Sequence, residues 1–314
     1  MIRLLSAELL RARSRHVIRV LMVGVVVGVV LSMGIATWNS ARSSADASYR
    51  SALASCMRGE FTPPGQVPPP YHSLAEYCAD QVRPENFQSN QLRWADLGQI
   101  LNGISSIVIL LGVLLGATLG GADWTAGSMG TLLTWEPRRI RVLIVRASVA
   151  AFVAFVFTMV AQAFFVLIYR LGVAIAGNTA GVARGMLGHA TGTAFRVAVV
   201  AALLAVVAHA LATLGRSTVA AVGILFGYLV IFEGFVSNLW IGLQPRLLIR
   251  AAVVVVAHQP LYDPRATVTF DSSGVTELSQ RVLLSVPGAW VVLFAWAIGL
   301  LVVGLFAFRV RDVN

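Results

Sequence analysis

Long apolar runs alternate with short polar segments along the whole chain. A helix needs about 20 apolar residues to cross a bilayer, because each residue adds about 1.5 Å. Six runs reach that length, at residues 17–37, 97–119, 147–168, 193–214, 218–236 and 286–308. A seventh run, at residues 247–257, is too short and predicts an interfacial or re-entrant helix. The pattern therefore predicts an all-α polytopic membrane protein with six transmembrane helices.

The composition supports a single transmembrane domain over residues 1–314. The chain is 57% hydrophobic and 12% charged, with a mean hydropathy of +0.79. A soluble domain has about 25% charged residues, so most of this chain faces something other than water. The first run is too long for the core of a signal peptide, and the cleavage-like sequence ending at Cys56 lies far beyond it. We expect a retained helix.

The charge is basic, and its placement is typical of a membrane protein. All 24 basic residues are arginines, and the formal net charge is +10. They lie at the ends of apolar runs or between them, and no nucleic-acid-binding motif occurs, which argues against a nucleic-acid partner. Half of them are concentrated in the short segments that share a side with the N-terminus. The positive-inside rule then predicts that both termini are cytoplasmic, in a plasma or inner membrane.

The long segments on the other side are residues 39–96 and 237–285, with a short glycine-rich connection at 172–192. The only two cysteines, Cys56 and Cys78, flank the prolines of the first segment. A disulfide on the oxidising side of the membrane is the preferred interpretation, and two free thiols are the alternative. Neither cysteine nor histidine spacing fits a metal site, so we expect none.

Residues 1–16 alternate apolar and basic positions at helical spacing. Leu5, Leu9 and Ala12 would share one face, and Arg11 and Arg15 would be polar neighbours. Such a helix lies in the headgroup layer, with its arginines toward anionic lipid. A simple topology anchor is the alternative, and the two roles are compatible.

Residues 121–141, between the second and third runs, predict a short cytoplasmic helix. Asp123 is a suitable N-cap, and Pro137 disfavours helix at Glu136, so about three turns would end near Trp135. Trp124 and Trp135 would hold this helix at the membrane surface. The segment could dock a soluble partner, or it could be an ordinary cytoplasmic turn.

The order of these parts resembles the permease subunit of a type-2 ATP-binding cassette (ABC) exporter. That family has an amphipathic entry helix, six spans, a coupling helix between spans two and three, and short extracytoplasmic helices between spans five and six. Its coupling segment carries an acid, then Gly-Thr, then a Pro-Arg-Arg-like turn. The matching residues are Asp123, Gly130, Thr131, Pro137, Arg138 and Arg139.

The resemblance implies that this segment, with Trp124 and Glu136, docks a separate ABC ATPase. It also implies two ATPase copies and a second permease half, identical or homologous. The long cysteine-bearing first loop departs from the family pattern and leaves the substrate class open.

The chain contains no lysine. A P-loop needs a lysine to reach the nucleotide phosphates, so this chain cannot supply that site. We therefore expect no enzyme activity and no cofactor in this chain, with ATP and Mg²⁺ bound by the partner ATPase.

Polar residues inside the spans bear on two other possible functions, an ion-coupled carrier and a membrane enzyme. An ion-coupled carrier usually needs buried acids or histidines along its path, and His209 and Glu233 are the candidates. We expect Glu233 to reach water and His209 to bond a neighbouring helix. A membrane enzyme would need a clustered site, which the sequence does not indicate. A non-transporting scaffold also remains open.

Glycines recur every four residues in the second run, at Gly112, Gly116 and Gly120. Small residues at this spacing let helices approach closely. The stripe indicates either packing within one subunit or a dimer interface.

Overall fold

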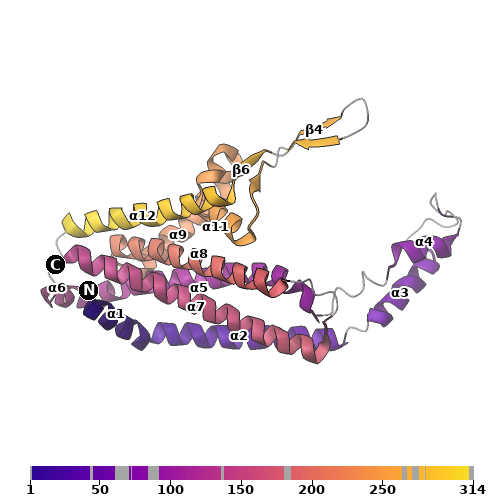
Figure 1. Cartoon of the computed structure of the whole chain (residues 1–314), viewed down its shortest axis with the longest axis horizontal. Helices are drawn as coiled ribbons and strands as arrows, with labels where there is room; N and C mark the ends of the chain where they lie inside the picture. The colour runs from indigo at the N-terminus through magenta and orange to yellow at the C-terminus, as the bar shows by residue number, and fades with distance from the viewer. Residues whose placement is uncertain are drawn as a thin grey trace. The chain divides into compact units, whose positions relative to one another are not determined.

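The computed structural model describes residues 2–42, 45–60, 71, 73–83, 92–135, 138–179, 185–263, 267–270, 276–279 and 281–310. Six of its helices are long and apolar enough to cross a membrane, which confirms the expected class (Figure 1). Spans one to four are α2 (His16–Arg42), α5 (Leu97–Thr125), α7 (Arg139–Ala176) and α8 (Met186–Gly215). Span five consists of α9 (Thr218–Tyr228), the π-helical segment η3 (Leu229–Val236) and α10 (Ser237–Leu239), and span six is α12 (Val286–Val310).

Among the described residues, five shorter α-helices lie outside these spans. They are α1 (Ile2–Ser14), α3 (Ala45–Met57), α4 (Leu74–Gln81), α6 (Ser128–Trp135) and α11 (Leu248–Ala257). Two short 3₁₀ helices, η2 (Trp94–Asp96) and η4 (Ile241–Arg246), precede α5 and α11. Helices α1, α6 and α11 fall where the sequence predicted short helices, whereas α3 and α4 were not expected.

The spans extend beyond their apolar runs. Helix α7 has 38 residues, about 57 Å at 1.5 Å per residue, although the run that predicted it covers only residues 147–168. Its extensions contain arginines, which end an apolar run but are good helix formers. The glycine-rich connection expected around residues 172–192 is shorter than that, since α7 continues to Ala176 and α8 begins at Met186.

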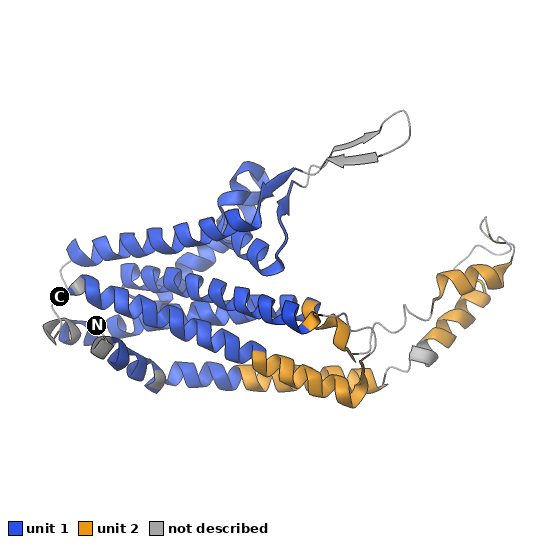
Figure 2. Ribbon diagram, viewed as in Figure 1, with its two compact units in different colours: residues 1–24, 99–162, 187–314 blue, residues 25–98, 163–186 orange. Residues whose placement is uncertain are grey.

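The chain forms two compact units, which Figure 2 shows in different colours. The first comprises residues 1–24, 99–162 and 187–314. Its centre is α8, of whose most apolar stretch 72% is buried. The glycine stripe of α5 packs on α8: a Cβ on Gly116 would lie 2.2 Å from the carbonyl oxygen of Ala205. The stripe thus serves packing within the chain, and the dimer interpretation of it is wrong.

The second unit comprises residues 25–98 and 163–186. Here the expected disulfide is confirmed, because Cys56 of α3 is bonded to Cys78 of α4. Both cysteines are buried and pack with Val82. The disulfide and its small apolar cluster therefore fasten α3 to α4.

A hydroxyl group joins three segments of the second unit. Strand β1 (Leu92–Arg93) pairs in parallel with β2 (Gly177–Asn178). The Ser40 hydroxyl donates to the carbonyl of Ala176 at 2.5 Å and accepts from the amide of Leu92 at 3.1 Å. Ser40 thereby connects the end of span one to the start of span two and the end of span three.

Two small antiparallel ribbons follow α11, a departure from the expected all-helical chain. Strand β3 (Leu261–Tyr262) pairs with β6 (Val282–Leu284), and β4 (Thr267–Phe270) pairs with β5 (Thr276–Ser279). Alternating threonine and valine around a turn rich in Ser and Gly is the usual hairpin pattern. The sequence contained this signal, but the helical interpretation overlooked it.

Candidate functional site

The first residues of the predicted coupling segment belong to the end of span two and not to the short helix that follows it. Helix α5 continues to Thr125, and α6 starts at Ser128, so Asp123 lies in the last turns of α5. The expectation that Asp123 is the N-cap of the short helix is therefore wrong. The chain turns at Gly127, which has a φ of +67°, a left-handed conformation that glycine adopts without strain after a helix C-terminus. Helix α6 has eight residues, about two turns and not three.

Asp123 joins three helices through its carboxylate. Arg15, at the junction of α1 and α2, donates to Oδ1 at 2.7 Å. Arg146 of α7 donates to Oδ2. The two arginines also donate to consecutive carbonyls of α5, at Thr118 and Leu119. The arginine side chains retain only 16% and 4% exposure, in that order, and charge-assisted hydrogen bonds of this kind are strong and directional.

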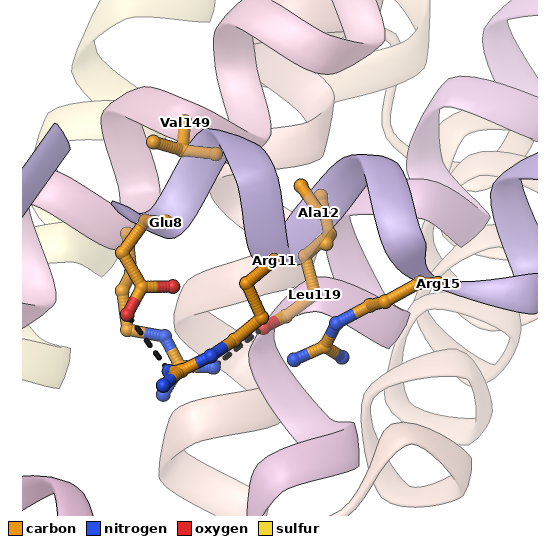
Figure 3. A pocket seen from close by; sticks show the side chains of 7 residues that line it. Glu8, Arg11, Ala12, Arg15, Leu119 and Val149 are labelled. Carbon is orange, nitrogen blue, oxygen red and sulfur yellow. Dashed lines mark hydrogen bonds and ion pairs between the residues drawn. The ribbon is translucent and has the colours of Figure 1, made fainter. Parts of the chain in front are cut away.

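A small cavity lies beside these ion pairs, where α1 covers α5 and α7. Figure 3 shows that its lining includes Glu8 and Arg11 of α1, Arg15 just after that helix, Leu119 of α5 and Val149 of α7. Arg11 forms an ion pair with Glu8 at 3.0 Å. The cavity volume is about 10 Å³, which is room for one water molecule. The cavity is therefore part of the packing of α1 and not a ligand site.

Helix α6 is anchored on the bundle by Met129 and by Trp124 just before it. Met129 is 2% exposed and packs with Leu143 and Phe308, and Arg146 donates to its sulfur at 3.1 Å. The Trp124 ring meets Phe308 edge-on, with centroids 5.9 Å apart, and the Arg216 guanidinium lies 5.1 Å from the centroid. Trp124 thus packs against span six and against the turn between spans four and five.

Other predicted residues of this segment are at the surface or outside the described residues. Gly130, Thr131 and Arg138 are exposed, and nothing lies within 4 Å of a Cβ built on Gly130. Glu136 and Pro137 lie outside the described residues, and so does the side chain of Arg139, which begins α7. The segment therefore has a buried side at Met129 and an exposed side at Gly130 and Thr131.

Glu233 does not reach water, contrary to expectation. It lies in η3 and is only 8% exposed. Its Oε1 accepts from the amide of Ile249 at 2.5 Å and from the Tyr228 hydroxyl at 3.3 Å. The Tyr228 hydroxyl in turn accepts from the amide of Leu248 at 3.0 Å. Glu233 and Tyr228 therefore bind the first turn of α11, a role that the sequence did not indicate.

His209 of α8 is 1% exposed. Its carbonyl accepts from the Thr213 hydroxyl at 2.9 Å and lies against Gly120. Among the described residues, neither ring nitrogen has a hydrogen-bond partner. The expected bond from His209 to a neighbouring helix is thus not seen.

No group of three or more potential metal ligands occurs in the described part of the chain. No family model matches the sequence, and no match was found among curated proteins or solved structures. The features that bear on function are the six spans, the anchored helix α6, the ion pairs at Asp123 and the contact between Glu233 and α11.

Proposed function

We propose that this chain is the transmembrane subunit of an ATP-driven exporter of the type-2 ABC class. The order of α1, six spans, α6 and α11 supports this proposal, as does the motif of Asp123, Gly130, Thr131, Pro137 and Arg138. The chain has no lysine and so cannot supply a P-loop; the resemblance implies that ATP and Mg²⁺ are bound by a partner ATPase, in two copies. A second permease half, identical or homologous, completes the path in a plasma or inner membrane, with both termini cytoplasmic.

The observation that carries the proposal is the two-sided environment of α6. Met129 is buried in the bundle, while Gly130 and Thr131 are exposed. A partner can therefore contact α6 without displacing the packing beneath it. Arg138 follows on the same exposed segment and provides positive charge for an acidic groove.

Force on α6 has direct routes into the spans. Met129 contacts Arg146 of span three, and Trp124 contacts Phe308 of span six. Asp123 connects the same region to Arg15 and hence to α1. A partner that presses on either α1 or α6 would therefore move the same group of helices, as coupling between two packed states requires.

The test is purification in mild detergent, with identification of bound proteins and an ATP-hydrolysis assay. We expect a stoichiometric soluble ATPase. The variants Gly130→Glu and Arg138→Glu should lower its retention at least tenfold while the chain stays in the membrane. Arg281→Glu, an equal charge reversal at an exposed arginine before β6, is the matched control and should retain it.

A chain recovered alone in several mild detergents, with no associated hydrolysis, would overturn the proposal. The favoured function would then be an ion-coupled carrier, because the ring nitrogens of His209 have no hydrogen-bond partner among the described residues. For such a carrier, His209→Gln should abolish uptake driven by a proton gradient. A scaffold would show neither activity.

A further inference from the structure

Span five changes its helix type midway. It is α-helical from Thr218 to Tyr228 and π-helical from Leu229 to Val236. The π-helical segment contains no proline that would force the change. Segments of this type are rare and often lie at functional sites, and this one gains contacts with a neighbouring helix.

What it gains is a contact with α11. The residue at the N-cap position of α11 is Leu247, which makes no side-chain cap. Instead, Tyr228 accepts from the amide of Leu248, and Glu233 accepts from the amide of Ile249. Span five thus supplies the cap that α11 lacks, and the Glu233 carboxylate also suits the positive end of the helix dipole.

Helix α11 is packed much more tightly within the chain than span five is. Six residues of α11 are buried, and α11 belongs to the main apolar core with α8 and α12. By contrast, only 11% of the most apolar stretch of span five is buried. The Trp296 indole of α12 donates to the carbonyl of Arg246 at 3.0 Å, which also fixes the chain just before α11. Within this chain, span five therefore has fewer packing contacts than α11 to hold it in place.

We propose that Glu233 is a latch that holds span five against α11, and that conversion of the π-helical segment to α-helix releases it. Gain or loss of one residue per turn rotates the following side chains by about 100° around the helix axis. Such a rotation carries Glu233 away from the amide of Ile249. Span five then separates from α11, and the bundle opens at the end away from α6. The opening of a transport path rests on the proposed transport function, whereas the contact between Glu233 and α11 and its release do not.

The first test measures the cap by hydrogen–deuterium exchange of the amides of Leu248 and Ile249 in the purified chain in lipid nanodiscs. Glu233→Ala should speed exchange of the Ile249 amide roughly five- to thirtyfold, the range expected for loss of a helix cap, whereas the Leu248 amide keeps its acceptor, the Tyr228 hydroxyl. Glu233→Gln, which keeps an acceptor oxygen, should restore most of the protection. Unchanged exchange in Glu233→Ala would overturn the latch.

The second test measures release, with spin labels on cysteines introduced at Leu239 of span five and Val291 of span six. Both positions are exposed, and both native cysteines are in the disulfide, so only the introduced thiols react. Glu233→Ala should add a second, longer distance. Deleting Val230 in that variant removes the extra residue of the π-helical segment, so that an α-helix forms with no rotation of the residues after it, and the second distance should disappear. A single unchanged distance in Glu233→Ala, or a second distance that survives the deletion, would overturn the release.

Both measurements use the isolated chain without ATPase. Failure of the exporter proposal would appear as absence of a bound ATPase, with the exchange and distance results intact. Failure of the latch would appear in those results whether or not an ATPase binds.

Discussion

Replacing Asp123 with asparagine removes the charge that compensates two arginines while keeping the shape of the side chain. Arg146 retains 4% side-chain exposure and cannot turn to water. Removing one partner of a buried ion pair costs about 3–5 kcal/mol, because the other charge stays buried and unpaired. We therefore expect Asp123→Asn to lower the free energy of unfolding by about 3–5 kcal/mol.

The assay is reversible unfolding in mixed micelles titrated with a denaturing detergent. Asp123→Asn combined with Arg146→Met removes the two most buried charges of this group and should recover part of the loss; Arg15, whose side chain keeps 16% exposure, is the charge left without its partner. Glu60→Gln is the control, because the pair of Glu60 and Arg58 is exposed and should contribute little. If Asp123→Asn unfolds no more easily than Glu60→Gln, or if the double variant is as unstable as the single one, the reasoning is refuted.

Three further predictions concern other parts of the chain. Gly116→Ala places a Cβ against the backbone of Ala205 and should cost about 1–3 kcal/mol by overpacking; the same unfolding assay should show no loss for Gly28→Ala, which meets nothing within 4 Å. Cys56→Ser with Cys78→Ser opens a loop whose ends are 22 residues apart, so α3 and α4 should lose about 3 kcal/mol of local stability, seen as faster proteolysis there and not in the spans. Hydrogen bonds from Tyr71 and Arg83 lower the pKa of Asp80 below its ordinary 3.8. The stability of this contact is therefore present above pH 3.8 and is lost as the pH falls through the lowered pKa; proteolysis of residues 71–83 should rise there, while Asp80→Asn should be insensitive to pH.

The six spans, the short helices α1, α6 and α11, and the pairing of Cys56 with Cys78 could be predicted because their signals are local or few. An apolar run of sufficient length has few alternatives to a membrane helix, and two cysteines allow only one pairing. The ends of the spans could not be read in the same way. Arginine stops an apolar run without stopping a helix, as α7 shows at Arg146 and Arg170.

The contacts of Asp123 and Glu233 could not be predicted from neighbouring residues. Asp123 looked like an N-cap because its spacing from the expected helix was suitable, but its partner Arg15 is 108 residues away. The π-helical segment reads as an ordinary apolar run, and the group that Glu233 binds is a backbone amide of a later helix. A weak signal was present, since Leu247 is a poor N-cap residue and implied that another element caps α11.

The Arg15 contact has a consequence for how the chain enters the membrane. During synthesis Asp123 appears 108 residues after Arg15, or about 5–20 s later at ordinary rates of translation. Span one must therefore stay in the lipid on its own hydropathy, and even in the finished chain only 6% of its most apolar stretch is buried. Span four, at 72% buried, can hold the buried His209 because neighbouring helices shield it. A polar substitution in the middle of span one would thus impair insertion of the nascent chain, whereas the same change in span four would act later, on assembly of the bundle.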